Sequence, residues 1–90
     1  MIAERQVTIL NVLGLHVRPA THFAEMASKY RSRISVIKED GPEINAKSSI
    51  DLLMLAAVAG TKLTLRAEGD DAREAVDALI RMIEEKFDEE

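Results

Sequence analysis

The sequence predicts an α+β fold in which a four-stranded antiparallel sheet is covered on one face by three helices. Four short segments alternate polar and apolar residues, as strands with one buried face do. Two other segments repeat apolar residues every three or four positions, which indicates amphipathic helices, and a capping pattern predicts a third, short helix. The order β-α-β-β-α-β-α favours an open-faced β-sandwich. Ninety residues suit one domain, expected to span residues 1–90.

The first half of the chain supplies three of the predicted strands and the first helix. Ile34 and Val36 alternate with polar neighbours, which is the pattern of a half-buried strand. Residues 17–30 instead carry apolar side chains at helical spacing, with Phe23 in the stripe. Residues 39–42 have the composition of a turn. The strands predicted in this half are residues 5–10, 33–38 and 43–46.

A short helix and the fourth strand follow. Ser48 and Asp51 have the spacing of a capping box, with a serine at the N-cap and an acid three residues later. This pattern predicts a short helix that starts at Ser48. After Gly60, residues 62–67 alternate as a strand that directs its leucines toward the core.

The last predicted element is a helix, the longest in the chain, with an apolar stripe over residues 72–87. An aspartate of residues 69–71 is expected to cap it. Asp77 and Arg81 are spaced to form an ion pair on its exposed side. The acidic residues 88–90 are expected to be a frayed end in water.

Composition narrows the possible functions. The net charge of −4 argues against nucleic acid as the main partner, because binding to phosphates needs a basic surface. The absence of cysteine excludes disulfides, thiol catalysis and cysteine metal sites. No segment has the pattern of a membrane span or of a secretory signal. We therefore expect a soluble cytoplasmic protein with no membrane insertion.

A histidine at the predicted start of the first helix is the main candidate functional residue. A strand ends just before Asn11, Gly14 permits a turn, and Pro19 suits a first helical turn. His16 therefore lies beside backbone N–H groups that have no partner within the helix and that bind anions such as phosphate. Arg18 adds a permanent charge with forked donors. Neutral imidazole can attack phosphorus, so these residues predict a histidine that carries a phosphoryl group.

Residues 11–20 read Asn-Val-Leu-Gly-Leu-His-Val-Arg-Pro-Ala. This segment resembles the signature N-x-x-G-L-H-A-R-P-A of the HPr family, the histidine phosphocarriers of the bacterial phosphoenolpyruvate-dependent sugar phosphotransferase system. Val17 replaces the usual alanine at the rim of the site. Ser48 lies where the family carries its regulatory serine, and the resemblance continues through Gly60 and the last helix. It covers nearly the whole chain.

The resemblance implies a place in phosphoryl transfer. Enzyme I, phosphorylated from phosphoenolpyruvate, would transfer the group to His16, which would pass it to enzyme IIA domains. The family uses the Nδ1 atom of the ring. Arg18 would stabilise the transferred group and Asn11 would orient the imidazole, and no cofactor or metal is implied. The phosphate-binding and orienting residues so implied are Asn11, Val17, Arg18 and Pro19.

The resemblance also implies regulation and docking. A serine-specific HPr kinase/phosphorylase would modify Ser48 in hosts that have one. Both phosphotransfer partners would dock beside His16, although Ser49 replaces a usual large apolar residue. A plainer alternative places Leu52 and Leu55 in the core, with the other apolar residues of this helix only flanking it. The docking positions implied by the family are Thr21, Ser49, Ile50 and Leu53.

Several alternatives remain open at this point. An independent enzyme could use His16 with a carboxylate, although the chain has no nucleotide-binding loop and little room for an enclosed pocket. A pure interaction module would not need His16 beside Arg18. His22 could join a metal site, but zinc requires three or four ligands. A regulatory or nitrogen-system HPr paralogue would act mainly by protein binding controlled through Ser48. We expect a monomer.

Overall fold

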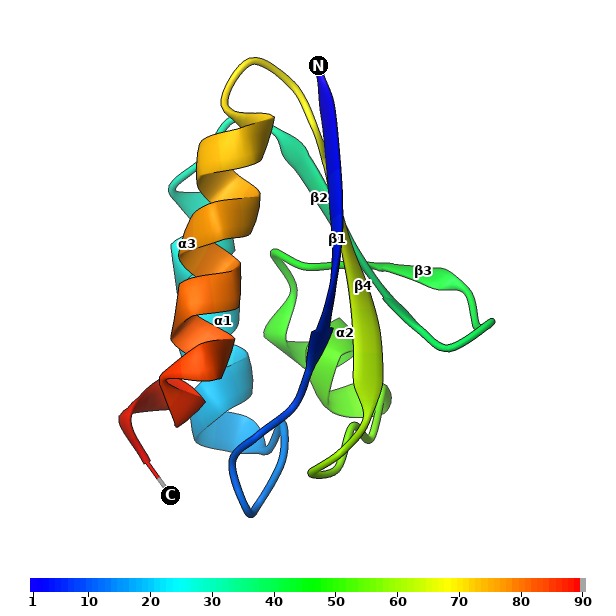
Figure 1. Ribbon diagram of the computed structural model, residues 1–90, viewed down its shortest axis with the longest axis vertical. Coiled ribbons are helices and arrows are strands. Elements are labelled where there is room, and N and C mark those ends of the chain that lie inside the picture. Colours follow the sequence, from blue (N-terminus) through cyan, green and yellow to red (C-terminus); the bar gives the residue numbers. More distant parts are fainter. Residues whose placement is uncertain (90) are drawn as a thin grey trace.

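The structure, a computed structural model, describes residues 1–89. Four antiparallel strands form one sheet in the order β1-β4-β2-β3. Figure 1 shows the helices gathered on one side of this sheet, which confirms the predicted open-faced sandwich and its element order. None of the helices within the described residues is long and apolar enough to cross a membrane. The elements are β1 (Ile2–Thr8), α1 (Val17–Ser28), β2 (Arg33–Lys38), β3 (Glu43–Asn45), α2 (Ser49–Met54), β4 (Lys62–Glu68), α3 (Ala72–Glu84) and a short turn η1 (Lys86–Asp88).

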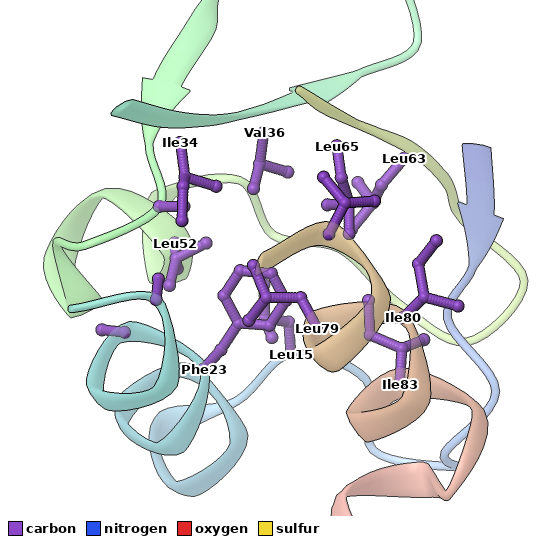
Figure 2. Close-up of a cluster of buried hydrophobic side chains, with 14 of the residues drawn as sticks. Leu15, Phe23, Ile34, Val36, Leu52, Leu63, Leu65, Leu79, Ile80 and Ile83 are labelled. Carbon is purple, nitrogen blue, oxygen red and sulfur yellow. The ribbon is translucent and has the colours of Figure 1, made fainter. Parts of the chain in front are cut away.

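The core fills the space between the sheet and the helices. Figure 2 shows Phe23 of α1 and Leu79 of α3 among its side chains, below the leucines of β4. Leu52, the buried residue of α2, closes one side. Leu15 also belongs to this cluster, although it lies in the loop before α1. Because Leu15 is buried, it fixes the chain immediately before His16.

The first strand begins and ends earlier than predicted. It covers Ile2–Thr8 instead of residues 5–10, because it pairs with β4 along its whole length, from Glu68 at one end to Lys62 at the other. Pairing with a neighbouring strand decides strand limits more strongly than the alternation of one segment does. The earlier end leaves Ile9 in the loop that leads to His16.

Asp71 is the N-cap residue of α3, as predicted, but its side chain makes no capping hydrogen bond. Its carboxylate instead accepts hydrogen bonds from the N–H groups of Arg31 (2.8 Å) and Ser32 (2.9 Å), and from the hydroxyl of Ser32. The hydroxyl of Ser32 is the main cause of the lowered pKa of Asp71, followed by the N–H of Arg31. These contacts follow directly after α1, which ends at Ser28 and not at residue 30 as predicted.

α3 is the longest element, as predicted, but it ends at Glu84. Phe87 reaches the core from the turn that follows the helix.

The predicted ion pair of Asp77 with Arg81 does not form, because Asp77 pairs with Arg5 instead. Since α3 packs beside β1, Oδ1 of Asp77 lies 3.3 Å from Nη1 of Arg5.

α2 begins where the capping pattern predicts. Oγ of Ser48 accepts a hydrogen bond from the N–H of Asp51 at 3.2 Å. The N–H of Ser48 donates to the carbonyl of Asn45 at 3.1 Å, so it is not available to the Asp51 carboxylate. One half of the capping box is therefore formed.

Candidate functional site

The loop between β1 and α1 is held by backbone hydrogen bonds to the segment before β4, and both lie at the lower end of Figure 1. The N–H of Ile9 donates to the carbonyl of Thr61 at 2.9 Å, and that of Leu15 to the carbonyl of Ala57 at 2.8 Å. Gly14 has a φ of +70°, and a Cβ there would meet the oxygen of Ala57 at 2.5 Å. The loop therefore keeps its shape only with glycine at this position.

His16 is the N-cap of α1, which confirms the predicted start of the helix. Its carbonyl accepts a hydrogen bond from the N–H of Ala20 at 2.9 Å. The N–H groups of Val17 and Arg18, the first two helical residues, have no partner within the helix. Pro19 lies in the first turn, as predicted, and has no N–H to leave unpaired. Two N–H groups without a partner in the helix, at the positive end of its dipole, thus adjoin the imidazole.

Glu89 lies against the imidazole of His16. Its Oε1 is 2.9 Å from Nε2 of His16 and 2.8 Å from Nδ2 of Asn11. The pKa of Glu89 is lowered, mainly by the hydrogen bond with His16, then by that with Asn11, with a contribution from the charge of Arg18. The carboxylate is therefore ionised at neutral pH and can only accept. It follows that Nε2 carries the hydrogen and that Nδ1 of the neutral ring keeps the lone pair.

Asn11 connects this carboxylate to the loop. Its side chain is fully buried, and Nδ2 donates both to Glu89 and to the carbonyl of Gly14, the latter at 2.7 Å. Oδ1 of Asn11 has no hydrogen-bond partner among residues 1–89. The amide of Asn11 contacts Glu89, and Glu89 in turn contacts the ring. The role of Asn11 in orienting the imidazole stays a prediction, with Glu89 as the link between the two side chains.

Sequence reasoning missed Glu89, because residues 88–90 were expected to be a frayed end. That expectation is wrong for Glu89, whose side chain is 15% exposed, and Glu90 lies outside the described residues. Phe87, which is buried, keeps the chain against the body of the protein after α3 ends. The apolar stripe that runs on to Phe87 was the one signal in the sequence that could have indicated this.

Apolar side chains are exposed around the loop and on α2. Ile50 is 71% and Leu53 36% exposed, whereas Leu52 is fully buried. α2 packs against α1, and Val58 lies beside Gly14. Of the other docking positions, Thr21 is exposed and Ser49 is half-buried. The other exposed large apolar residues of the loop and its neighbouring segments are Leu10, Val12, Leu13, Val17, Met54 and Val58.

The second histidine is separate from this arrangement. His22 is exposed on α1. Within residues 1–89 no group of three or more histidine or acidic side chains is placed to hold a metal ion.

Comparison with known proteins relates the chain to histidine phosphocarriers. The family model described as the PTS HPr component phosphorylation site matches residues 3–85. The phosphocarrier protein NPr of Shewanella violacea is 43% identical over 86 residues, covering 96% of this chain and 93% of that protein. The phosphocarrier protein HPr of Cupriavidus necator is 37% identical and covers 96% of each. The crystal structure of HPr-C-His from Thermoanaerobacter tengcongensis is similar with a TM-score of 0.92 and 44% identity, covering 98% of each chain.

Proposed function

The chain belongs to the HPr family of phosphocarriers, and from this membership we propose that His16 accepts a phosphoryl group from phospho-enzyme I and passes it to enzyme IIA domains. The system served is the phosphoenolpyruvate-dependent sugar phosphotransferase system. The protein is a covalent carrier in this chain of transfers and not an independent enzyme. The observation that carries the proposal is the position of His16 at the N-cap of α1, next to Arg18 and to two backbone N–H groups that have no partner within the helix.

The accepting atom in this proposal is Nδ1. Glu89 accepts the hydrogen of Nε2, so the lone pair of the neutral ring belongs to Nδ1. That lone pair forms a bond to phosphorus while the bond from phosphorus to the donor residue of enzyme I breaks. Transfer to an enzyme IIA domain reverses these roles. Positioning and electrostatic stabilisation supply most of the rate acceleration in such transfers.

The residues around the ring have distinct roles. The guanidinium of Arg18 and the N–H groups of Val17 and Arg18 stabilise the transferred group as its charge shifts. Pro19 favours the helical conformation of the first turn because its φ is restricted. Asn11 acts on the ring indirectly, because its side chain donates hydrogen bonds to Glu89 and to the carbonyl of Gly14.

Both partners dock on the surface that surrounds His16. Large apolar side chains that point into water, such as Ile50 and Val17, are typical of a protein interface when they occur together. Leu53 extends this surface along α2, with Thr21 and Ser49 at its edge. The same surface serves enzyme I and the enzyme IIA domains in turn, because both must reach the same ring nitrogen.

A second candidate function is regulatory. Ser48 caps α2 and lies within one helical turn of Ile50, so a phosphate from an HPr kinase/phosphorylase would change the docking surface. The alternative to the sugar system is a nitrogen-system or regulatory paralogue that acts mainly by binding. Relatives named NPr and HPr are both similar to this chain, at 43% and 37% identity, so the choice needs an experiment. In either case we propose one domain over residues 1–90, acting as a cytoplasmic monomer.

Incubation with phosphoenolpyruvate and enzyme I tests the proposal. The native protein should acquire one acid-labile phosphate, and His16→Ala should acquire none while remaining folded, because His16 is 33% exposed and outside the core. His22→Ala is the matched control and should be labelled like the native protein. Labelling of His16→Ala, or none of the native protein, would contradict the carrier function. Comparing enzyme I of the sugar system with its nitrogen-system counterpart would decide which pathway is served.

A further inference from the structure

The chain after α3 makes an uncommon left-handed turn. Lys86, Phe87 and Asp88 have φ values of 57°, 54° and 60°, a conformation that residues other than glycine rarely adopt. Three in succession are costly, because the side-chain Cβ approaches the backbone in this region. Buried Phe87 offsets part of that cost through its contacts with the core. After this turn, Glu89 lies against the loop that contains His16.

The carboxylate of Glu89 is held there by two donors of different character. Nδ2 of Asn11, in a fully buried side chain, reaches Oε1 at 2.8 Å and is itself oriented by the carbonyl of Gly14. Nε2 of His16 reaches the same oxygen at 2.9 Å. Glu89 therefore links the buried amide of Asn11 to the partly exposed imidazole of His16. The position of the imidazole depends on that of the carboxylate.

From these contacts we propose that Glu89 is a positioning residue for phosphoryl transfer, which keeps His16 in the tautomer with hydrogen on Nε2 and balances the charge that the ring gains. This inference rests on the proposed function. It concerns a residue outside the family match, which ends at residue 85. Glu89 does not touch the phosphoryl group in this scheme, and it acts on the transfer only through the imidazole.

The charge balance of the step explains the role. When the Nδ1 lone pair forms its bond to phosphorus, the bond to the donor breaks and its electron pair leaves with the donor. The ring then has substituents on both nitrogens and carries a positive charge, because Nε2 keeps its hydrogen. A carboxylate 2.9 Å from Nε2 stabilises that charge without removing the proton. On transfer to the next acceptor the ring leaves as neutral imidazole, and Nε2 keeps its hydrogen and still donates it to Oε1 of Glu89.

Two variants of Glu89 separate the hydrogen bond from the charge. Glu89→Gln keeps an oxygen that can accept from Nε2 but removes the negative charge, whereas Glu89→Ala removes both. Asp88→Asn is the matched control, since it removes the same charge one residue earlier and asparagine tolerates the φ of 60° at that position. All three variants are exposed to the same phospho-enzyme I, and the rate of phosphorylation of His16 is measured.

We expect the rate to fall roughly threefold to tenfold in Glu89→Gln, because the negative charge beside the ring is lost, and further in Glu89→Ala, because the hydrogen bond is lost as well. The ¹⁵N chemical shifts of the imidazole give a second readout that does not need activity. They should report almost only the Nε2–H tautomer in the native protein and in Asp88→Asn, and a larger share of the Nδ1–H tautomer in Glu89→Ala.

The outcomes distinguish this inference from the function on which it rests. If the native protein is phosphorylated but Glu89→Ala matches Asp88→Asn in both rate and tautomer, Glu89 has no positioning role although the carrier function stands. A faster Glu89→Ala would show that the carboxylate blocks the ring, which also overturns the proposal. If His16 of the native protein accepts no phosphate at all, the carrier function itself is wrong, whatever the ¹⁵N spectra show.

Discussion

Gly14 and Ala57 are so close that a Cβ on Gly14 would lie 2.5 Å from the carbonyl oxygen of Ala57. The N–H of Leu15 donates to that same oxygen at 2.8 Å. The contact therefore ties the loop before α1 to the segment before β4. It fixes the approach of the chain to His16, two residues after Gly14 in the sequence.

Gly14→Ala should destabilise the protein by about 2–4 kcal/mol, because it adds a backbone clash to the cost of a positive φ. Gly60→Ala is the matched control. Gly60 has a φ of +91° but nothing within 4 Å of the added Cβ, so this variant should lose only about 1–2 kcal/mol. Urea unfolding of both variants measures the difference. Equal losses would show that the contact with Ala57 adds nothing to the conformational cost.

Arg18→Ala should slow phosphorylation of His16 without abolishing it. Loss of one preorganised charged donor typically costs on the order of 2–4 kcal/mol in the transition state, or about a hundredfold in rate. Arg73→Ala, which removes an exposed arginine from the first turn of α3, serves as the control. An unchanged rate in Arg18→Ala would assign the stabilisation of the phosphoryl group to the backbone N–H groups alone.

Ser48→Asp should leave the melting temperature near or above that of the native protein, because aspartate is as good an N-cap as serine and its charge suits a helix start. Phosphorylation of His16 by enzyme I should nevertheless slow severalfold or more. Docking would bring the new charge beside an apolar contact at Ile50, which is unfavourable unless the charge is paired.

Mass spectrometry of protein treated with an HPr kinase identifies the modified serine. We expect phosphate on Ser48 and not on Ser49, which occupies an apolar position of the family. Modification of Ser49 alone would contradict the regulatory assignment, as would a Ser48→Asp variant that enzyme I phosphorylates at the native rate. Neither result would affect the role of His16.

Asp71 should make stability depend on pH in the acidic range. Its pKa in the folded protein is lowered from 3.8 by the hydrogen bonds from Ser32 and Arg31. The stabilisation is therefore fully present above pH 3.8 and is lost as the pH falls through the lower folded value. Asp71→Asn should melt below the native protein at pH 7, and the difference should shrink as the pH falls below 3.8.

The control for this prediction is Asp70→Asn, which changes the same charge at an exposed neighbour. Its melting temperature should follow that of the native protein at every pH. A difference between native protein and Asp71→Asn that stays constant from pH 7 down to pH 2.5 would show that the carboxylate charge is not what stabilises this connection.

The sequence by itself determined the sheet, the order of the elements and the start of α1. These features depend on local periodicity and on short signals such as Ser48 and Pro19, whose effects act within a few residues. The limits of β1 were less predictable, because pairing with β4 decides them. The hydrogen bonds of the Asp71 side chain could not be predicted for a similar reason, because its partners lie 39 and 40 positions away in the chain.

Only the tertiary structure determined that Glu89 contacts the imidazole of His16. Glu89 and His16 are 73 positions apart, and no pattern of neighbouring residues links them. Their contact requires the packed core, which places the end of α3 beside the loop, and the left-handed turn anchored by Phe87. His16 could be proposed as the nucleophile from its neighbours in the chain. The tautomer proposed for its ring depends instead on packing between distant segments.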